Sequence, residues 1–163
     1  MKKRIGLIIL FILIIALIGV ISMYIFNGKK KEITSINKLH LSYSNGYMMD
    51  ANTIYDIEKK DDKFFVTIKP YLIPEEKSQT VELDKKTINK IIDILNKNEV
   101  YKWDGFNKSD KYVLDGDSFS FWVYMEDGKE IHASGYMKWP ENYGNVRDEL
   151  TNILGSLYVQ EVE

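Results

Sequence analysis

With 163 residues, of which 45% are hydrophobic and 28% charged, the chain has the size and composition of a protein with one folded domain. The formal net charge is −2, and six of the 22 basic residues lie at positions 2–4 and 29–31, so the rest of the chain is distinctly acidic. An acidic domain without a basic stripe argues against nucleic acid as a partner. The chain has no cysteine, which excludes disulfides, a cysteine nucleophile and an acylated cysteine anchor.

Residues 5–26 form an apolar run without a charged side chain. As a helix this run would be about 33 Å long, against roughly 30 Å for the hydrocarbon core of a bilayer. Two interpretations stay open, a retained transmembrane helix and a cleaved secretory signal. We favour the helix, because the apolar part of a signal spans only roughly 7–15 residues before a small-residue cleavage site. Here the best cleavage candidate, residues 20–22, is followed by four more apolar residues.

Lysine and arginine flank this run on both sides, so the positive-inside rule does not choose an orientation. A very short N-terminal stub favours a cytoplasmic N-terminus and a domain outside the cell membrane. The lipid bilayer would then be the partner of the apolar run. The predicted organisation is a stub at 1–4, a transmembrane helix at 5–26, a linker at 27–38, a globular domain at 39–158 and a tail at 159–163.

The first half of the domain contains patterns typical of strands. Residues 39–44 alternate apolar and polar side chains and end at an Asn-Gly pair, which indicates a half-buried strand. Residues 52–71 predict two strands around a polar turn at 60–62. Residues 79–83 predict a further short strand.

Two stretches have the apolar spacing of helices. Asp84 is a suitable N-cap for a helix whose apolar positions fall on one face: Ile88, Ile91, Ile92 and Leu95. Near the C-terminus a second face is formed by Val146, Leu150, Ile153, Leu154 and Leu157. Together with a hairpin at 118–137, these patterns predict an α+β domain. We expect an antiparallel sheet of about five to six strands with two helices on one face, preceded by one transmembrane helix.

The hairpin at 118–137 has two possible registers. A two-residue turn would place Tyr124 opposite Ile131, whereas a three-residue loop with Gly128 in a left-handed bulge places Val123 opposite Ile131. We predict the bulged loop, because the other register would bury His132 among apolar side chains.

The stretch Asp115-Gly116-Asp117 invites a metal-binding interpretation. An EF-hand loop that starts at Asp115 needs an acid at its fifth position and a glycine at its sixth, where this chain has Phe119 and Ser120. We therefore predict a turn that opens a strand, with solvated acids and no metal site.

A catalytic constellation is also not indicated. His40 and His132 are the only histidines, and residues 132–135 lack the first glycine of a G-x-S-x-G nucleophile elbow. No cofactor is predicted either.

Aromatic residues make up 13% of the chain, and those in its second half include Trp103, Trp122, Tyr124, Tyr136, Trp139 and Tyr143. Core and turn packing explains such residues in most proteins. The alternative is an exposed aromatic surface for a protein or a sugar. We expect Trp122, Tyr124 and His132 on the sheet face away from the helices, and we add Trp139 to this candidate ligand or partner surface.

Four short motifs resemble a pattern of small bacterial exported domains of unknown function. The pattern runs W-x-G-F, D-G-x-S, D-G-K and P-x-N-Y, and here it is found in W-D-G-F (103–106), L-D-G-D-S-F (114–119), E-D-G-K-E-I (126–131) and G-Y-M-K-W-P-E-N-Y (135–143). The resemblance covers residues 100–158 and implies a membrane- or lipid-anchored exported domain without a known activity.

The sequence therefore predicts a single-pass, membrane-anchored binding or interaction module on the extracytoplasmic side. One alternative is a membrane-tethered enzyme that acts on cell-envelope material through surface carboxylates. Another is a stress or immunity factor that protects the cell.

Overall fold

The computed structural model describes residues 14–17, 32–46, 52–70 and 78–158. The contacts divide the chain into two compact units, residues 1–31 and 32–163. Every strand of the described part belongs to the second unit, and the fold of that unit positions the candidate sites.

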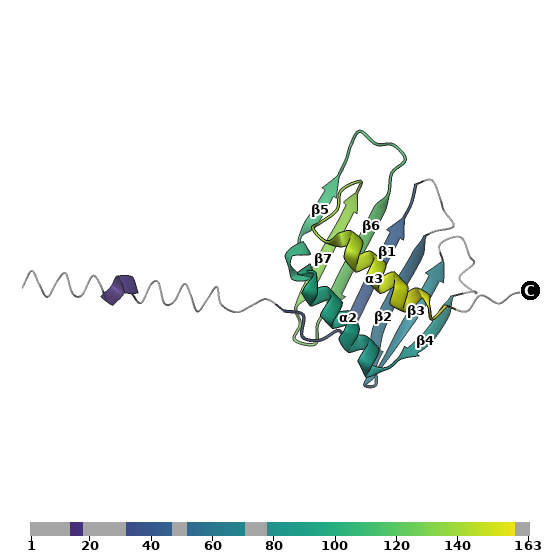
Figure 1. Cartoon of the computed structure of the whole chain (residues 1–163), viewed down its shortest axis with the longest axis horizontal. Helices are drawn as coiled ribbons and strands as arrows, with labels where there is room; N and C mark the ends of the chain where they lie inside the picture. Colours follow the sequence, from purple (N-terminus) through teal and green to yellow (C-terminus); the bar gives the residue numbers. More distant parts are fainter. Residues whose placement is uncertain (1–13, 18–31, 47–51, 71–77, 159–163) are drawn as a thin grey trace, which may run out of the picture. The chain divides into compact units, whose positions relative to one another are not determined.

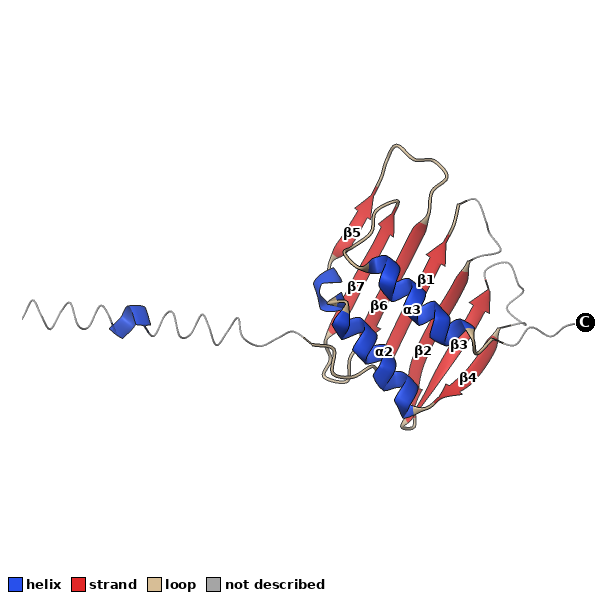
Figure 2. Ribbon diagram, in the orientation of Figure 1, coloured by secondary structure: helices blue, strands red, loops and turns tan. Residues whose placement is uncertain are grey.

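The described residues of the second unit form a seven-stranded sheet in the order β4-β3-β2-β1-β6-β7-β5 (Figure 1). All neighbouring strands are antiparallel except β5 and β7, which are parallel. The strands are β1 (Lys38–Ser44), β2 (Thr53–Lys60), β3 (Lys63–Pro70), β4 (Gln79–Leu83), β5 (Phe106–Ser109), β6 (Ser118–Tyr124) and β7 (Glu130–Tyr136). The helices of this unit are α2 (Lys85–Lys97), the 3-10 helix η3 (Val100–Trp103) and α3 (Tyr143–Gly155) (Figure 2).

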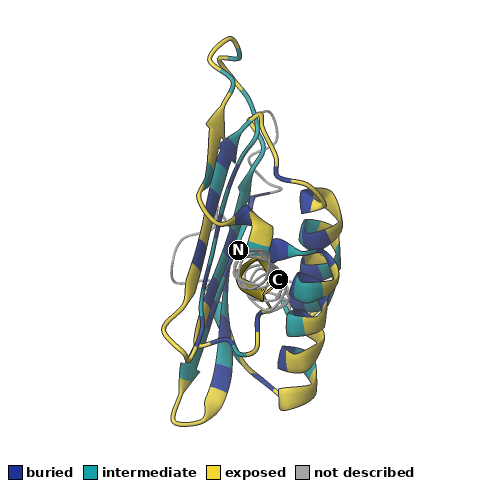
Figure 3. Cartoon of the chain, turned by 90° about the vertical axis from the view of Figure 1, so that its left-hand side faces the viewer, coloured by how far each residue is buried: buried dark blue, intermediate teal, exposed yellow. Residues whose placement is uncertain are grey.

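Helices α2 and α3 cross the same face of the sheet, which we call the inner face, and none of the described helices of this unit lies on the outer face (Figure 3). Successive side chains of a strand point to opposite faces, so the alternating pattern of the sequence sorts apolar residues inward. The inner face is buried and includes Leu39, Leu41, Ile57, Val66, Phe121, Val123 and Ile131. The helices cover it with Ile88, Ile91, Leu95, Val146, Leu150 and Leu154.

The segment that precedes β1 also packs into this core. Ile33 and Ile36 are each 1% exposed. The Asn96 side chain accepts from the Ile33 backbone N–H and donates to the Ile33 carbonyl, both at 2.8 Å. This pair of hydrogen bonds ties the segment before β1 to the end of α2.

Several local predictions are confirmed. The Asp84 carboxylate accepts from the Thr87 N–H at 2.7 Å and caps α2. Val123 lies opposite Ile131, and Gly128 has a φ of 81°, as the bulged loop requires. One feature of α2 differs, because Ile94 is buried whereas Ile92 is only partly buried.

The predicted sheet is wrong in strand number and in direction. The described residues contain seven strands instead of five to six, and the sheet is mixed. The strand missed is β5, whose sequence Phe-Asn-Lys-Ser has a single apolar residue and no alternation. It joins the sheet through backbone pairing with β7, a strand that follows it by about twenty residues, so no turn signal marks the parallel pair.

The predicted count of two helices is also wrong, because η3 is a third helix among the described residues of this unit. A 3-10 helix of four residues is too short to show helical periodicity. The α+β class itself is confirmed.

The predicted transmembrane helix must be corrected as well. Of residues 5–26 the structure describes only 14–17, which are helical, and the rest of that stretch lies outside the described residues. Among the described residues, no helix is long and apolar enough to cross a membrane.

Candidate functional site

The outer face of the sheet carries a row of directly opposed side chains that crosses five strands. In the order of the strands from β3 to β7, the row consists of Thr67, Asp56, His40, Trp122 and His132. Directly opposed side chains on one face of a sheet are in contact. The antiparallel registers therefore bring one carboxylate, two imidazoles and an indole side by side.

His40 is the centre of this row. Its Nδ1 lies 2.7 Å from Oδ1 of Asp56, and its ring lies parallel to the Trp122 indole, with centroids 5.2 Å apart and 7° between the planes. The Lys69 ammonium lies 3.7 Å from the other oxygen of Asp56. Asp56 thus orients the imidazole, and the imidazole supports one face of Trp122.

Tyr124 and His132 complete an aromatic cluster with Trp122. The Tyr124 ring stands edge-on to Trp122 at 5.2 Å and to His132 at 5.4 Å between centroids. His132 is exposed, and its Nε2 lies 3.3 Å from a carboxylate oxygen of Glu130. The structure therefore brings together three of the four residues predicted for the ligand surface.

A hollow of about 410 Å³ lies beside this cluster, and its lining includes Trp122, His132, Ser120, Ser134 and Asn107. Trp122 stacks on His40 and is also a lining residue of the hollow. Ser120 and Ser134 are directly opposed and line its floor. The Ser134 hydroxyl donates to Oδ1 of Asn107 at 3.4 Å.

The far wall of the hollow is held in place by the turn between η3 and β5. Oδ1 of Asp104 accepts from the His132 N–H at 3.3 Å, and the Gly105 N–H donates to the His132 carbonyl at 3.0 Å. Gly105 has a φ of 76°, which favours glycine at this turn. The wall and the aromatic cluster are thus parts of one hydrogen-bonded unit.

The charged side chains next to the cluster are paired with one another. Lys38 and Lys60 each contact Glu58 at 2.8 Å. Hydrogen bonds from these lysines, Lys38 first, lower the pKa of Glu58 from 4.5 to about 2, and the hydrogen bond that Lys38 donates to Glu58 raises the pKa of Lys38. This flank of the outer face offers a charged ligand little net attraction.

Trp139, the fourth predicted residue, does not belong to this surface. Its indole stacks on Tyr143 with centroids 4.9 Å apart and contacts Phe119, whose side chain points to the inner face. It is 38% exposed, at the loop before α3. The sheet therefore separates Trp139 from Trp122.

The Asp115-Gly116-Asp117 stretch leads into β6, as predicted, but its second acid is not simply solvated. Asp117 accepts from the Tyr43 hydroxyl at 2.7 Å and from the Gly46 N–H at 3.3 Å. The carboxylate thus joins the start of β6 to the end of β1. Across the described ranges of the chain, no three His, Asp or Glu side chains form a group that could hold a metal ion.

Sequence reasoning missed His40 and Asp56. The alternation in 39–44 puts His40 on the polar face of its strand, which is the only local signal. Its contact with Trp122 depends on the pairing of β1 with β6, two strands that are far apart in the sequence.

Comparisons with known protein families, with curated proteins and with solved structures give no match to this chain. The resemblance to exported bacterial domains therefore stays a prediction, and the chemistry of the outer face itself has to indicate the function. The hollow on this face is lined by the flat indole of Trp122, by the hydroxyls of Ser120 and Ser134, and by the polar side chains of Asn107 and His132.

Proposed function

We propose that this protein is a non-catalytic binding module that takes a neutral carbohydrate on the outer face of its sheet. The observation that carries the proposal is the position of Trp122. Its ring stacks on His40, and it lines a hollow together with Ser120 and Ser134.

A sugar ring matches this combination of surfaces. One face of a pyranose consists of C–H groups, which are attracted to the negative face of an aromatic ring. The hydroxyls around the sugar need donors and acceptors, and Asn107, His132 and the two serines line the hollow with such groups. The stack on His40 holds the indole before the ligand arrives, which lowers the entropy cost of binding.

A neutral ligand fits better than a charged one. The chain is acidic overall, and Asp56 and Glu130 lie close to the aromatic cluster, where each faces a histidine. The paired charges around Glu58 add no attraction for an ion. The extracytoplasmic location predicted from the sequence, which stays a prediction, would bring the module into contact with glycans of the cell envelope.

The proposal is tested by titrating the ¹⁵N-labelled full chain with neutral oligosaccharides of glucose and of N-acetylglucosamine. We expect saturable shifts of the Trp122 indole and of amides in β6 and β7. Trp122→Ala should weaken binding by roughly ten-fold or more, because one lost stacking contact is worth about 1.4 kcal/mol or more.

Trp139→Ala is the matched control, since it removes an exposed tryptophan from the other side of the sheet and should leave binding unchanged. Equal binding by Trp122→Ala and wild type would refute the proposal. So would shifts confined to α3.

A further inference from the structure

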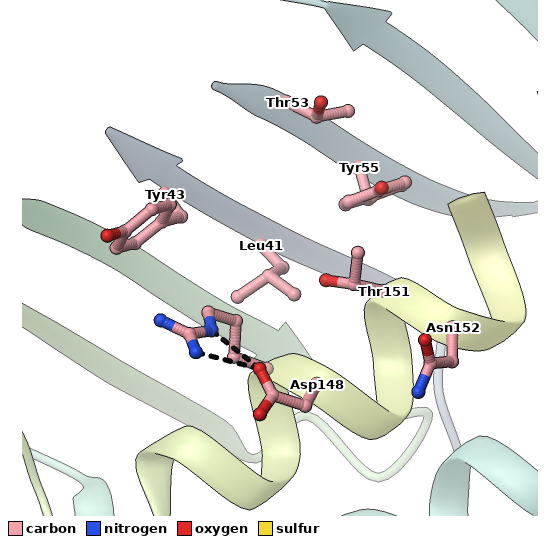
Figure 4. A pocket seen from close by; sticks show the side chains of 8 residues that line it. Leu41, Tyr43, Thr53, Tyr55, Asp148, Thr151 and Asn152 are labelled. Carbon is pink, nitrogen blue, oxygen red and sulfur yellow. Dashed lines mark hydrogen bonds and ion pairs between the residues drawn. The ribbon is translucent and has the colours of Figure 1, made fainter. Parts of the chain in front are cut away.

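A second polar hollow lies on the inner side of the sheet, between α3 and the adjoining ends of β1 and β2. It has a volume of about 480 Å³. Leu41 lies at its floor, and its walls are Tyr43, Thr53 and Tyr55 on the strands and Asp148, Thr151 and Asn152 on the helix (Figure 4). A neighbouring hollow of about 360 Å³ lies at the start of α3 and includes Asp117 and Tyr143. Arg147 lines both hollows, so its side chain lies where they meet.

The Arg147 guanidinium is held loosely. Its carbon lies 5.1 Å from the centre of the Tyr43 ring, and its Nε and Nη2 donate to the same oxygen of Asp148 at 2.9 and 2.8 Å. Neighbouring residues of a helix do not face each other, and the Asp148 side chain is 62% exposed. Such an ion pair is weak, and it uses one carboxylate oxygen where a guanidinium fork can engage two.

Tyr143 lies one helical turn before Arg147 and adds a second signal. It is 4% exposed, and its hydroxyl has no hydrogen-bond partner among the described residues. Burial raises the pKa of this hydroxyl, so it remains a neutral donor. A buried hydroxyl without a partner destabilises the fold, and an acceptor oxygen of a ligand would satisfy it.

From these contacts we propose that an organic carboxylate binds at Arg147, where the two hollows meet, takes the Arg147 fork over from Asp148 and supplies an acceptor for Tyr143 of the smaller hollow. The apolar surface of Leu41 and Tyr55 would receive the carbon skeleton, and Thr53, Thr151 and Asn152 its polar substituents. A dianion fits less well, because Asp117 and Asp148 lie close to Arg147. This site is independent of the outer face and of the carbohydrate proposal.

The test is a titration of the ¹⁵N-labelled full chain with sodium propionate, and with propionamide as the neutral isostere. A second arm uses acetyl-trialanine with a free C-terminal carboxylate and the same peptide as its amide. We expect saturable shifts around Arg147 with the carboxylates only. Tighter binding of propionate would identify a small-molecule ligand, and tighter binding of the peptide would identify a chain terminus.

Substitutions in α3 test the proposal further, because they should change the affinity for propionate in opposite directions. Arg147→Gln should weaken propionate binding at least ten-fold, whereas Asp148→Asn should strengthen it several-fold by removing the competing carboxylate. Glu149→Gln makes the same charge change one residue further on, at a side chain that contacts Lys97, and should have no effect.

Three results would overturn the proposal: equal binding of propionamide, weaker binding by Asp148→Asn, or tighter binding of inorganic phosphate than of propionate. If Arg147→Gln fails to fold, as judged by circular dichroism, the direction in which Asp148→Asn changes the affinity for propionate still tests the proposal.

Discussion

The imidazole of His40 and the indole of Trp122 stack in parallel across directly opposed positions of β1 and β6, with their centroids 5.2 Å apart. β1 is the central strand of the seven described and β6 is its neighbour, so the ring pair lies away from both edges of the sheet. Asp56 holds the imidazole from the other side at 2.7 Å. This relationship makes Trp122 a prepositioned wall instead of a freely rotating side chain.

His40→Ala should therefore weaken carbohydrate binding roughly three- to ten-fold, although His40 does not line the hollow, because the indole would lose its support. The readout of a positioning role is the Trp122 indole N–H resonance, which should shift and broaden in the unliganded variant. Lys38→Ala, on the same strand and face but opposite Tyr124, is the control and should leave the resonance sharp. An unchanged indole signal in His40→Ala would contradict the support role.

Substitution by alanine should change the free energy of unfolding in opposite directions at Gly128 and at Gly144. Gly128 has a φ of 81° in the β6–β7 loop, so Gly128→Ala should lower the free energy of unfolding by about 1 kcal/mol, the cost of a left-handed alanine. Gly144 lies in the first turn of α3 with nothing within 4 Å of an added Cβ, and Gly144→Ala should raise stability by about 0.5 kcal/mol. Urea unfolding measures both. Shifts of the same sign would show that backbone conformation does not control these two sites.

Removal of the hydroxyl should change the free energy of unfolding in opposite directions at Tyr143 and at Tyr43. Tyr143→Phe should raise the free energy of unfolding by about 1 kcal/mol, because its buried hydroxyl has no partner among the described residues. Tyr43→Phe should lower it by about 1 kcal/mol, because the Tyr43 hydroxyl donates to Asp117 at 2.7 Å. The comparison is made by urea unfolding without added carboxylate. A destabilised Tyr143→Phe would mean that its hydroxyl is satisfied.

Glu58 should contribute to acid unfolding. Its pKa in the folded protein is lowered from 4.5 to about 2 by its contacts with Lys38 and Lys60. A lowered pKa stabilises the fold above the unfolded value, and this stabilisation is lost as the pH falls from about 4.5 towards 2. Glu58→Gln should therefore lose less stability between pH 5.5 and pH 2.5 than the wild type, as measured by urea midpoints. Equal losses would show that the contacts do not persist in solution.

Trp103 should be the most sensitive of the three tryptophans to truncation. It is 2% exposed, stands edge-on to Phe121 at 5.3 Å, and donates from Nε1 to the Glu141 carbonyl at 2.9 Å. Trp103→Ala should cost about 3–5 kcal/mol. Urea unfolding at constant m-value measures the loss, with the half-buried Trp122→Ala as the comparison. A smaller loss for Trp103 than for Trp122 would contradict its assignment to the core.

The secondary structure was largely predictable because its signals are local. Alternation identified β1, and a capping aspartate with apolar spacing identified α2. The register of the β6–β7 hairpin followed from a simple requirement, that His132 stay out of the core. The sequence did not predict β5, which has one apolar residue in four, or η3, which has only four residues. Elements this short carry too few side chains to show a period.

The candidate surfaces were only partly predictable. Trp122, Tyr124 and His132 could be grouped because one hairpin carries all three. Trp139 is close to them in sequence, yet it lies on the other side of the sheet because the chain turns back from β7 into α3. His40 and Arg147 were not linked to any site by pattern alone.

Apart from β5 and η3, the sequence by itself determined which segments become strands and helices and which side of each strand is apolar, because these properties depend on side chains within one short segment. Only the tertiary structure decided that β1 pairs with β6, that β5 runs parallel to β7, and that α3 brings Arg147 over Tyr43. These choices join residues far apart in the chain, and they depend on how the apolar faces pack together, which no single segment encodes.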